Sequence, residues 1–477
     1  METRHVEIAI VGAGTGGMGA YREARKYTSS IALIDGGPLG TTCARVGCMP
    51  SKLLIAPAEA AHAHARWQAF GLEGEAPRVN GEAVLARVRH ERDRFVGFVR
   101  DAVENFNADH LIRRYASFVD PHTLELFGGE GDVERIVAKR IVLAPGSRPF
   151  VPPPFEGAGD RLVVNDDVFD WTELPGSVAV FGAGVIGLEL GQALHRLGVR
   201  VHLFGRDHFV GPITDRELRD YAAQTFEAEF AATWHADATI SRDGDEVVVQ
   251  WDGNEERFDH LLAATGRRPN LDRVAIENAG IELGPRGLPS FDPMTMRIGE
   301  SHIFLAGDAS GDLPLLHEAS DEGRIAGENA ARFPEVYRRA RRTPLGIAFT
   351  DPQIALVGET RRSLEARGAD FVVGEVSFED QGRSRVMLIN KGRLYVYAEE
   401  RTGRFLGAEM FGPSAEHVAH LLAWAIESRL TVGEILQRPF YHPVIEEGVR
   451  TAFRKANAAL GFAPNPPLRC IDCGPGA

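Results

Sequence analysis

The stretch VEIAIVGAGTGGMGAYREARKYTSSIALID, residues 6–35, decides the expected fold of this chain. An apolar, β-branched run leads into a glycine turn, a helix-like segment and a second strand that ends at Asp35. In such a turn Gly12 allows the tight bend, Gly14 lets the backbone approach a pyrophosphate, and Gly17 lets the helix pack on the strand. The helix N-terminus presents unpaired N–H groups to the phosphates, and Asp35, 23 residues after Gly12, can accept from ribose hydroxyls. The segment predicts a dinucleotide-binding βαβ unit.

The same plan recurs later in the chain. SVAVF precedes the turn GAGVIG, which is followed by the helix-like LELGQALHRL and the strand VRVHLF. Gly182, Gly184 and Gly187 stand where Gly12, Gly14 and Gly17 stand in the first copy. The duplication predicts two nucleotide-binding units in one polypeptide.

The two units differ at the end of their second strand. Counting 23 residues from Gly182 reaches Gly205 instead of an acid, and Arg206 follows. A missing carboxylate removes repulsion from a 2′-phosphate, and a guanidinium can bind that phosphate bidentately. We therefore favour NADP over NAD at this site. Gly187 is a counter-signal, since Ala is frequent there in NADP-binding relatives, and a surface arginine after a strand is also common.

Length and composition exclude several classes of protein. A chain of 477 residues, 44% hydrophobic and 25% charged, is typical of a globular protein of two to four domains. Its net charge of -14 argues against nucleic acid as the main partner. Its apolar runs are strand-sized, so no membrane partner is expected, and the opening METRHVEIAI lacks a basic-then-apolar leader. We expect a cytoplasmic protein.

Cys43 and Cys48 form a close pair in GTTCARVGCMPSK, which we expect at the start of a helix. A helix N-terminus lowers a thiol pKa, so one of the two can be a thiolate near neutral pH. The spacing is compatible with a reducible, redox-active bond. The alternatives are two buried free thiols or a zinc site, which would need the distant Cys470 and Cys473. We expect no metal.

With these motifs the chain resembles the flavin-dependent pyridine nucleotide–disulfide oxidoreductases, the family of dihydrolipoamide dehydrogenase and glutathione reductase, over roughly residues 5–460. The resemblance implies that the first unit binds FAD and the second NAD(P)H. It also implies that Cys48 is the flavin-proximal thiol and Cys43 the thiol that exchanges with substrate. Lys52 and Glu189 match a lysine–glutamate pair near the flavin ring. Further expected cofactor-binding residues are Gly146 and Gly266. Gly307 and Asp308 match the family's second flavin fingerprint, and His317 falls at a helix start that faces the flavin in the family.

HPVIEE near the C-terminus supplies the last functional motif. His442 and Glu447 match the family's acid–base dyad, in which the carboxylate orients the imidazole and raises its pKa. In the family this histidine serves the other subunit, so the resemblance implies a homodimer. The alternative is an ordinary surface or core histidine.

The expected fold class is α/β, with two Rossmann-like domains and a C-terminal α+β dimerisation domain. The expected division is 1–150 and 271–342 for FAD, 151–270 for NAD(P), 343–463 for the subunit interface, and 464–477 as a flexible tail with CxxC.

The sequence predicts an enzyme that passes electrons between NAD(P)H and a disulfide or dithiol, most similar to dihydrolipoamide dehydrogenase. The disulfide is a small molecule or protein-borne, with a lipoyl group as one candidate. Arg45 and Tyr441 depart from the family near the expected substrate approach. One alternative is a thioredoxin- or metal-directed reductase that relays electrons through Cys470 and Cys473. Another is a non-catalytic flavoprotein subunit of a complex, which would have no need of both the cysteine pair and the dyad.

Overall fold

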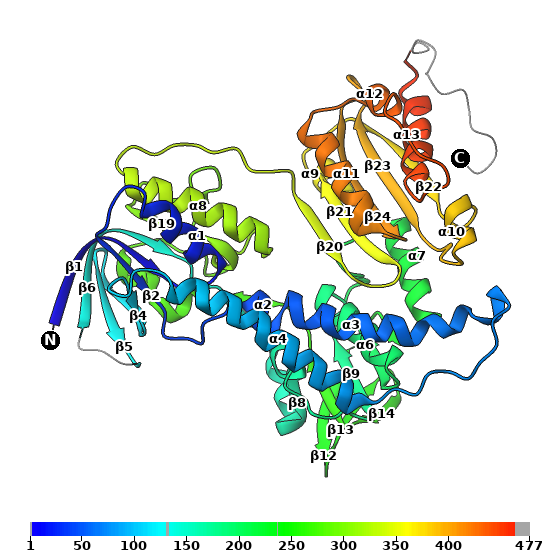
Figure 1. Cartoon of the computed structure of the whole chain (residues 1–477), viewed down its shortest axis with the longest axis horizontal. Helices are drawn as coiled ribbons and strands as arrows, with labels where there is room; N and C mark the ends of the chain where they lie inside the picture. Colours follow the sequence, from blue (N-terminus) through cyan, green and yellow to red (C-terminus); the bar gives the residue numbers. More distant parts are fainter. Residues whose placement is uncertain (1, 130–132, 236, 463–477) are drawn as a thin grey trace.

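The computed structural model describes residues 2–129, 133–235 and 237–462 of the chain. It contains three units, each built on its own main sheet (Figure 1). The α/β class and the three-part architecture expected from the sequence are confirmed. Among the described residues, no helix is long and apolar enough to cross a bilayer.

The first unit is a nine-stranded sheet that contains β1, the second half of which is almost entirely buried. β1 pairs in parallel with β2 on one side and β6 on the other, so its carboxyl end faces the start of α1. The chain returns to this unit after a long excursion, when β19 joins the sheet beside β6. Its elements are β1 (Glu2–Val11), α1 (Thr15–Ala24), β2 (Ile31–Ile34), α2 (Thr42–Val46), α3 (Cys48–His62), η1 (Ala63–Arg66), η2 (Gln68–Phe70), α4 (Gly81–Glu104), β3 (Leu111–Ile112), β4 (Tyr115–Asp120), β5 (Thr123–Phe127), β6 (Val133–Leu143), β17 (Phe291–Asp292), β18 (Arg297–Ile298), β19 (Ile303–Leu305), η6 (Gly307–Ser310) and α8 (Leu316–Arg332).

The second unit repeats the design with the parallel order β11-β10-β9-β15-β8. β9 is apolar and fully buried because helices or a second sheet cover both of its faces. The elements are η3 (Pro153–Arg161), β8 (Leu162–Val164), α5 (Asn165–Val168), β9 (Ser177–Phe181), α6 (Val185–Arg196), β10 (Arg200–Phe204), α7 (Arg216–Glu227), β11 (Ala231–Thr233), the small sheet β12 (Thr239–Asp243), β13 (Glu246–Trp251) and β14 (Asn254–Phe258), and β15 (His260–Ala263).

The first two units are joined by a two-stranded antiparallel sheet and two short helices. β7 (Ser147–Pro149) leaves the first unit and pairs antiparallel with β16 (Arg267–Pro269), which leaves the second. η4 (Asn270–Val274) and η5 (Ile276–Ala279) then lead back to the first sheet.

The third unit is an antiparallel sheet of order β20-β21-β24-β23-β22, with α11 and α13 packed on it. An extended linker, residues 333–344, connects it to α8 (Figure 1). Its elements are β20 (Leu345–Ala348), β21 (Gln353–Gly358), α9 (Arg361–Ala366), β22 (Phe371–Ser377), α10 (Gly382–Val386), β23 (Arg393–Glu399), β24 (Phe405–Gly412), α11 (Ala415–Glu427), α12 (Val432–Leu436) and α13 (Glu447–Leu460).

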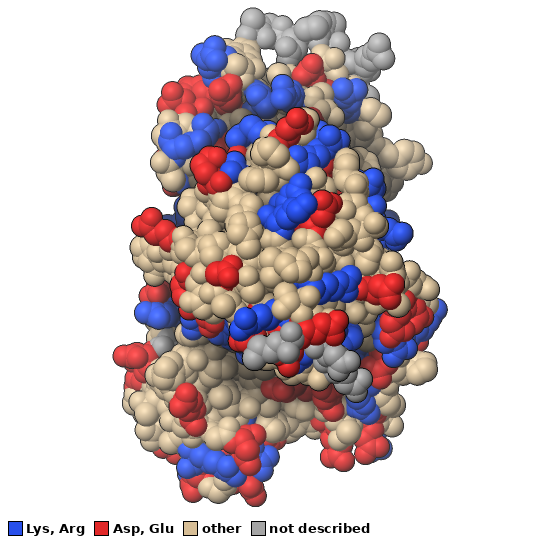
Figure 2. All heavy atoms as spheres, turned by 90° about the vertical axis from the view of Figure 1, so that its left-hand side faces the viewer, with Lys and Arg blue, Asp and Glu red and all other residues tan. Residues whose placement is uncertain are grey.

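The surface carries charges of both signs. On the face shown in Figure 2, acidic and basic side chains lie next to one another and form no single basic field.

Candidate active site

The first glycine turn has the backbone that a dinucleotide seat requires. Gly12 has φ +103°, and a Cβ there would lie 2.1 Å from the carbonyl oxygen of Ala144. A Cβ on Gly17 would lie 1.7 Å from the carbonyl oxygen of Gly12, so the helix can approach the strand only without one. Gly14 has no atom within 4 Å of its Cβ position and lines the cleft. The closed sides hold the turn, and the open side leaves room for a pyrophosphate at the N-terminus of α1.

The second turn repeats this geometry. Gly182 has φ +110°, and its Cβ position lies 2.3 Å from the carbonyl oxygen of Ala264. The Cβ position of Gly187 lies 1.8 Å from the oxygen of Gly182, and that of Gly184 is open. Both turns therefore fit a diphosphate by the same steric rule.

The ends of the two second strands differ as the sequence indicates. Both oxygens of Asp35 accept backbone N–H groups, from Ala13 at 2.7 Å and from Gly37 at 2.8 Å. Asp35 thereby fixes its own loop to the first turn, and each oxygen keeps a further lone pair. Arg206 lines the cleft beside the second turn with a side chain that is 90% exposed, and it pairs with Asp207 at 3.3 Å.

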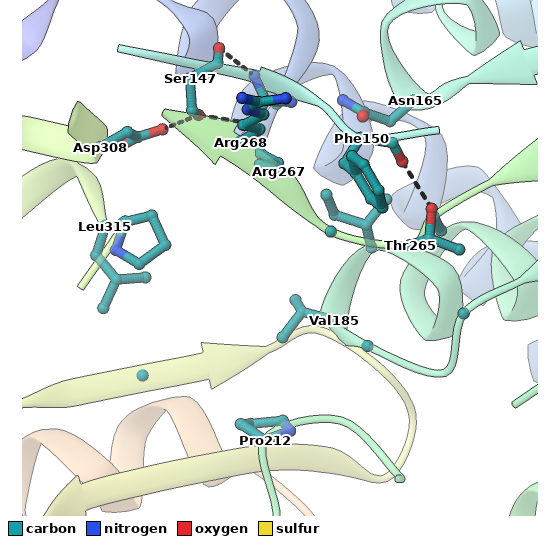
Figure 3. Close-up of a pocket in the computed structure, with 18 of the residues that line it drawn as sticks. Ser147, Phe150, Asn165, Val185, Pro212, Thr265, Arg267, Arg268, Asp308 and Leu315 are labelled. Atoms are coloured by element: carbon teal, nitrogen blue, oxygen red, sulfur yellow. Dashed lines mark hydrogen bonds between the residues drawn. The ribbon is translucent and has the colours of Figure 1, made fainter. Parts of the chain in front are cut away.

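A polar cluster joins the two glycine-turn units at the β7–β16 pair. The Ser147 hydroxyl donates to Asp308 at 2.6 Å, and Arg267 donates to that hydroxyl at 2.9 Å and to the Ser147 carbonyl (Figure 3). Gly146 and Gly266, which precede these residues, have φ of +69° and +105°. The sequence predicts a role for the two glycines, whereas Ser147 and Arg267 are functional candidates that only the structure identified. The sequence does contain a signal for both residues, because the similar tetrapeptides GSRP (146–149) and GRRP (266–269) follow equivalent strands of the two repeats.

The two cysteines lie on two helices. Cys43 is in the short α2, whose start is capped by the Thr41 hydroxyl accepting from the N–H of Ala44 at 3.2 Å. Cys48 is the first residue of α3, after the break at Gly47. Each cysteine therefore lies at the start of a helix, as expected, but there are two helices instead of one because the backbone of Gly47 interrupts the helical path.

The two thiols interact closely, and their pKa values are shifted in opposite directions. A hydrogen bond from Cys43 lowers the pKa of Cys48 to about 7; burial opposes this shift and the positive charge of Lys52 adds to it. The same hydrogen bond, followed by burial, raises the pKa of Cys43. Cys48 is therefore the thiol that carries negative charge near neutral pH.

The base of the cleft is an ion pair between units. The Lys52 ammonium donates to both oxygens of Glu189, at 2.9 and 2.7 Å, and lies over the ring of Phe349 with 4.6 Å to its centroid. Glu189 is 4% exposed and also accepts from the N–H of Phe349 at 2.8 Å. Because the three residues come from three units, this contact is where the units meet.

One cleft of about 1920 Å³ connects these features, which is more than a single small-molecule pocket needs. Of the residues expected from the sequence, it is lined by Gly14, Cys43, Cys48, Lys52, Gly146, Gly182, Gly184, Glu189, Arg206, Gly266, Gly307 and Asp308. Gly12, Gly17, Asp35 and Gly187 are not among its lining residues; the three glycines shape the turns through backbone contacts instead. His317, on the first turn of α8, is 45% exposed and also does not line it.

The expected dyad forms outside this cleft. The Nδ1 atom of His442 lies 3.0 Å from the Glu447 carboxylate, which also accepts from the N–H of Val444 at 3.2 Å. The Glu447 side chain is 3% exposed and that of His442 is 67% exposed. A buried carboxylate thus orients an imidazole whose other nitrogen has no hydrogen bond within residues 2–129, 133–235 and 237–462, and neither residue lines the cleft that these residues form.

The fold and this site define a nucleotide-dependent flavoprotein with a dithiol centre, and comparison with known proteins gives the family. Residues 6–323 match the family model of pyridine nucleotide-disulphide oxidoreductases, and residues 345–453 match that family's dimerisation domain. The chain belongs to this family and is an FAD-dependent oxidoreductase of NAD(P)H and disulfides.

Individual relatives agree with this assignment. A dihydrolipoyl dehydrogenase of Haloferax volcanii is 31% identical, with 96% of this chain and 97% of that protein covered. A soluble pyridine nucleotide transhydrogenase of Marinobacter nauticus is 29% identical, with 95% and 98% covered. Among solved structures, LpdA of Mycobacterium tuberculosis has a TM-score of 0.81 at 24% identity, with 94% and 99% covered, and therefore supports the fold.

Proposed function

We propose that this enzyme reduces a disulfide substrate, or oxidises the corresponding dithiol, at Cys43 and Cys48, with FAD at the first glycine turn and NAD(P)H at the second. Residues 1–150 and 271–342 would hold FAD, residues 151–270 the nicotinamide dinucleotide, and residues 343–463 the partner subunit. The observation that carries the proposal is the position of the thiol pair and the Lys52–Glu189 pair in one cleft that both turns enter.

The flavin, when bound, supplies hydride and electron transfer between the nicotinamide and the thiols. The residues of the chain then have separate tasks. Asp308, fixed by Ser147, would accept a hydrogen bond from the flavin's polar chain, and Lys52, fixed by Glu189, would supply a positive charge to the flavin as it does to Cys48. Cys48 holds its charge as a thiolate, while Cys43 keeps its proton until a base removes it.

We propose that His442, oriented by Glu447, is that base and that it acts on the thiols of a partner subunit. Its exposed imidazole and its position outside its own cleft support this assignment. The match to a dimerisation domain supports a homodimer, in which each active site is completed by the other chain.

For the nicotinamide, we propose a preference for NADPH over NADH. Gly205, which follows β10, stands where the first unit has the carboxylate of Asp35, and the Arg206 guanidinium is exposed beside the second turn, where it can bind a 2′-phosphate in competition with its pairing to Asp207. The dependence on NAD(P)H and on a reduced thiol pair also supports a cytoplasmic location.

For the substrate, we propose a lipoyl-like disulfide, small or protein-borne, because several similar proteins are dihydrolipoyl dehydrogenases. The transhydrogenase relatives suggest a second candidate, hydride exchange between two nicotinamides. That reaction needs no thiol pair, so the pair and the dyad favour the disulfide reaction. The alternative that uses Cys470 and Cys473 is not favoured by the comparisons, and both residues lie outside the described part of the chain.

Anaerobic stopped-flow measurements test the proposal. Holoenzyme reduced by NADPH or NADH is mixed with lipoamide, other low-molecular-weight disulfides, or the oxidised form of the second nicotinamide. We expect rapid reoxidation by lipoamide that is lost in Cys43→Ser. Reoxidation only by a nicotinamide, unchanged in Cys43→Ser, would contradict the disulfide reaction and support transhydrogenation.

A further inference from the structure

The linker that leaves the first unit is bound to that unit by a row of ion pairs. Four of its arginines pair with acids: Arg338 with Asp292, Arg339 with Glu328, Arg341 with both Glu318 and Glu322, and Arg342 with Asp321. Three of these arginine side chains are half or more exposed, whereas that of Arg341 is 18% exposed. Arg341 is therefore the buried contact in a row of surface contacts.

The acids that bind Arg341 lie on the buried face of α8, one turn apart. The side chains of Glu318 and Glu322 are 3% and 0% exposed. One terminal nitrogen of Arg341 donates to both carboxylates, at 2.9 Å for Glu322. Two buried acids at this spacing repel each other, and the guanidinium is the cation bound between them.

Glu322 connects this cluster to the cleft. While one oxygen accepts from Arg341, the other accepts from the backbone N–H of Gly307 at 2.7 Å. Gly307 opens η6 with φ +71°, and the next residue is Asp308, which is held by Ser147. A continuous path of two contacts thus runs from the linker through Glu322 to the turn that carries Asp308.

The hydrogen bond between Glu322 and Gly307 depends on Arg341, because Arg341 supplies the positive charge that the two buried acids share. Burial raises the pKa of Glu322 to about 7, and the nearby Arg341 opposes that shift. Without the guanidinium, two buried carboxylates would remain without a cation bound between them. A buried acid that loses its partner moves, hydrates or takes up a proton, and each response disturbs its hydrogen bond to Gly307.

We propose that Arg341 is a positioning residue for FAD: it holds Glu322 against the Gly307–Asp308 turn, so that retention of the flavin depends on the linker lying along α8. This inference rests on the proposed flavin-binding role of that turn. The linker then does more than connect two domains: the segment that leads to the dimerisation domain also stabilises the Gly307–Asp308 turn at the proposed flavin site.

The test compares two neighbouring arginines in the holoenzyme. Release of FAD is followed by the fluorescence of free flavin at a fixed temperature below unfolding. Arg341→Met should release FAD at least about tenfold faster than the parent, because a buried ion pair is broken. Arg342→Met removes the exposed pair with Asp321 (side chains 64% and 19% exposed) from the same helix and should stay within about twofold of the parent.

Two further variants separate charge from general destabilisation. Adding Glu318→Gln to Arg341→Met removes one uncompensated acid and should bring the release rate back toward that of the parent. Hydrogen exchange should increase at residues 307–310 in Arg341→Met, while β1 and β6 stay protected. Equal FAD release from the Arg341→Met and Arg342→Met enzymes would overturn the proposal.

The cofactor seat itself is checked separately. Asp308→Ala should accelerate FAD release, and an unchanged rate would show that the proposed flavin-binding turn is wrong. If Asp308→Ala accelerates release but Arg341→Met does not, only the proposed role of the linker is refuted. If Arg341→Met yields no folded holoenzyme, Arg341→Lys decides. A point charge cannot reproduce the guanidinium's contacts with both acids, so FAD release faster than in Arg342→Met supports the proposal and an equal rate refutes it.

Discussion

The charge state of Cys48 depends on the residues around it. A hydrogen bond from Cys43 and the charge of Lys52 stabilise its thiolate, and burial opposes them. The two thiols therefore divide the chemistry between a charged and a protonated sulfur, although both come from the same short motif.

In the reduced enzyme, the alkylation rate of Cys48 should rise with pH through about 7, because the thiolate is the reactive form and its fraction grows above the pKa. In Cys43→Ala the same rise should occur at higher pH, since the largest stabilising contact is lost. Timed iodoacetamide labelling with mass spectrometry measures both profiles. Superimposable profiles would show that Cys43 does not stabilise the thiolate.

Replacing His442 by Gln should slow thiol–disulfide exchange by about two to four orders of magnitude, as expected for loss of a positioned acid–base. Reduction of the flavin by the nicotinamide should change little, because that step precedes the dithiol chemistry. Rapid mixing resolves the two half-reactions.

His417→Gln is the matched control for that variant. His417 is an exposed histidine of α11 (72% exposed side chain) that also lies beside a glutamate, at 3.7 Å. It should leave both half-reactions unchanged. A collapse of flavin reduction in His442→Gln would instead make His442 a structural residue.

At the scale of elements, the loop after β10 distinguishes the two glycine-turn units. The first unit ends its second strand at Asp35, which is engaged with its own turn, and the second ends at Gly205 with the exposed Arg206 beside it. We expect these two similar βαβ elements to bind different dinucleotides, because the residue that follows the second strand of such a unit contributes to the charge near the ribose.

Arg206→Ala should lower kcat/KM for NADPH by about 10-fold or more and that for NADH by far less, since a charge-assisted contact to a phosphate is lost. Steady-state rates with both cofactors measure the difference. Arg216→Ala, which removes another exposed arginine of the same domain (86% exposed side chain), should affect neither. Equal losses with both cofactors, or a parent that prefers NADH, would contradict the assignment.

At the scale of the whole molecule, buried polar contacts fix the units on one another. Glu409 of β24 is fully buried and accepts backbone N–H groups from Thr214 at 2.6 Å, Asp215 at 3.1 Å and Arg361 at 2.9 Å. The third unit thereby holds the second in place, while Lys52, Glu189 and Phe349 join all three at the cleft. The cleft is a product of this assembly.

A mixture of Cys43→Ser and His442→Gln enzymes tests whether the dyad serves the other subunit. If it does, subunit exchange should restore about a quarter of the parental activity, since half of the dimers are hybrids and each hybrid has one intact site. Activity is measured before and after mild dissociation and reassociation, with each variant treated alone as the control. Hybrids that remain inactive would place His442 at the site of its own chain.

Local sequence by itself determined the two βαβ units, the glycine turns and the dyad's spacing. The turn itself requires glycine at Gly12 and Gly182, whose φ values are +103° and +110°, so these positions can be recognised without a structure; the close approach of Ala144 and Ala264 to them comes from the folded sheet. His442 and Glu447 lie five positions apart, and the short turn between them brings their side chains together.

Only the tertiary structure decided which distant side chains share a site. Lys52 meets Glu189 across 137 positions, and Ser147 meets Asp308 across 161, because the packing of separate sheets and not local conformation brings them together. The link from Arg341 through Glu322 to Gly307 is of the same kind, since an arginine-rich linker has the composition of a solvated segment. Whether a charged side chain is buried, and therefore needs a partner of opposite charge, is decided by the packing of the folded chain and cannot be derived from one segment of the sequence.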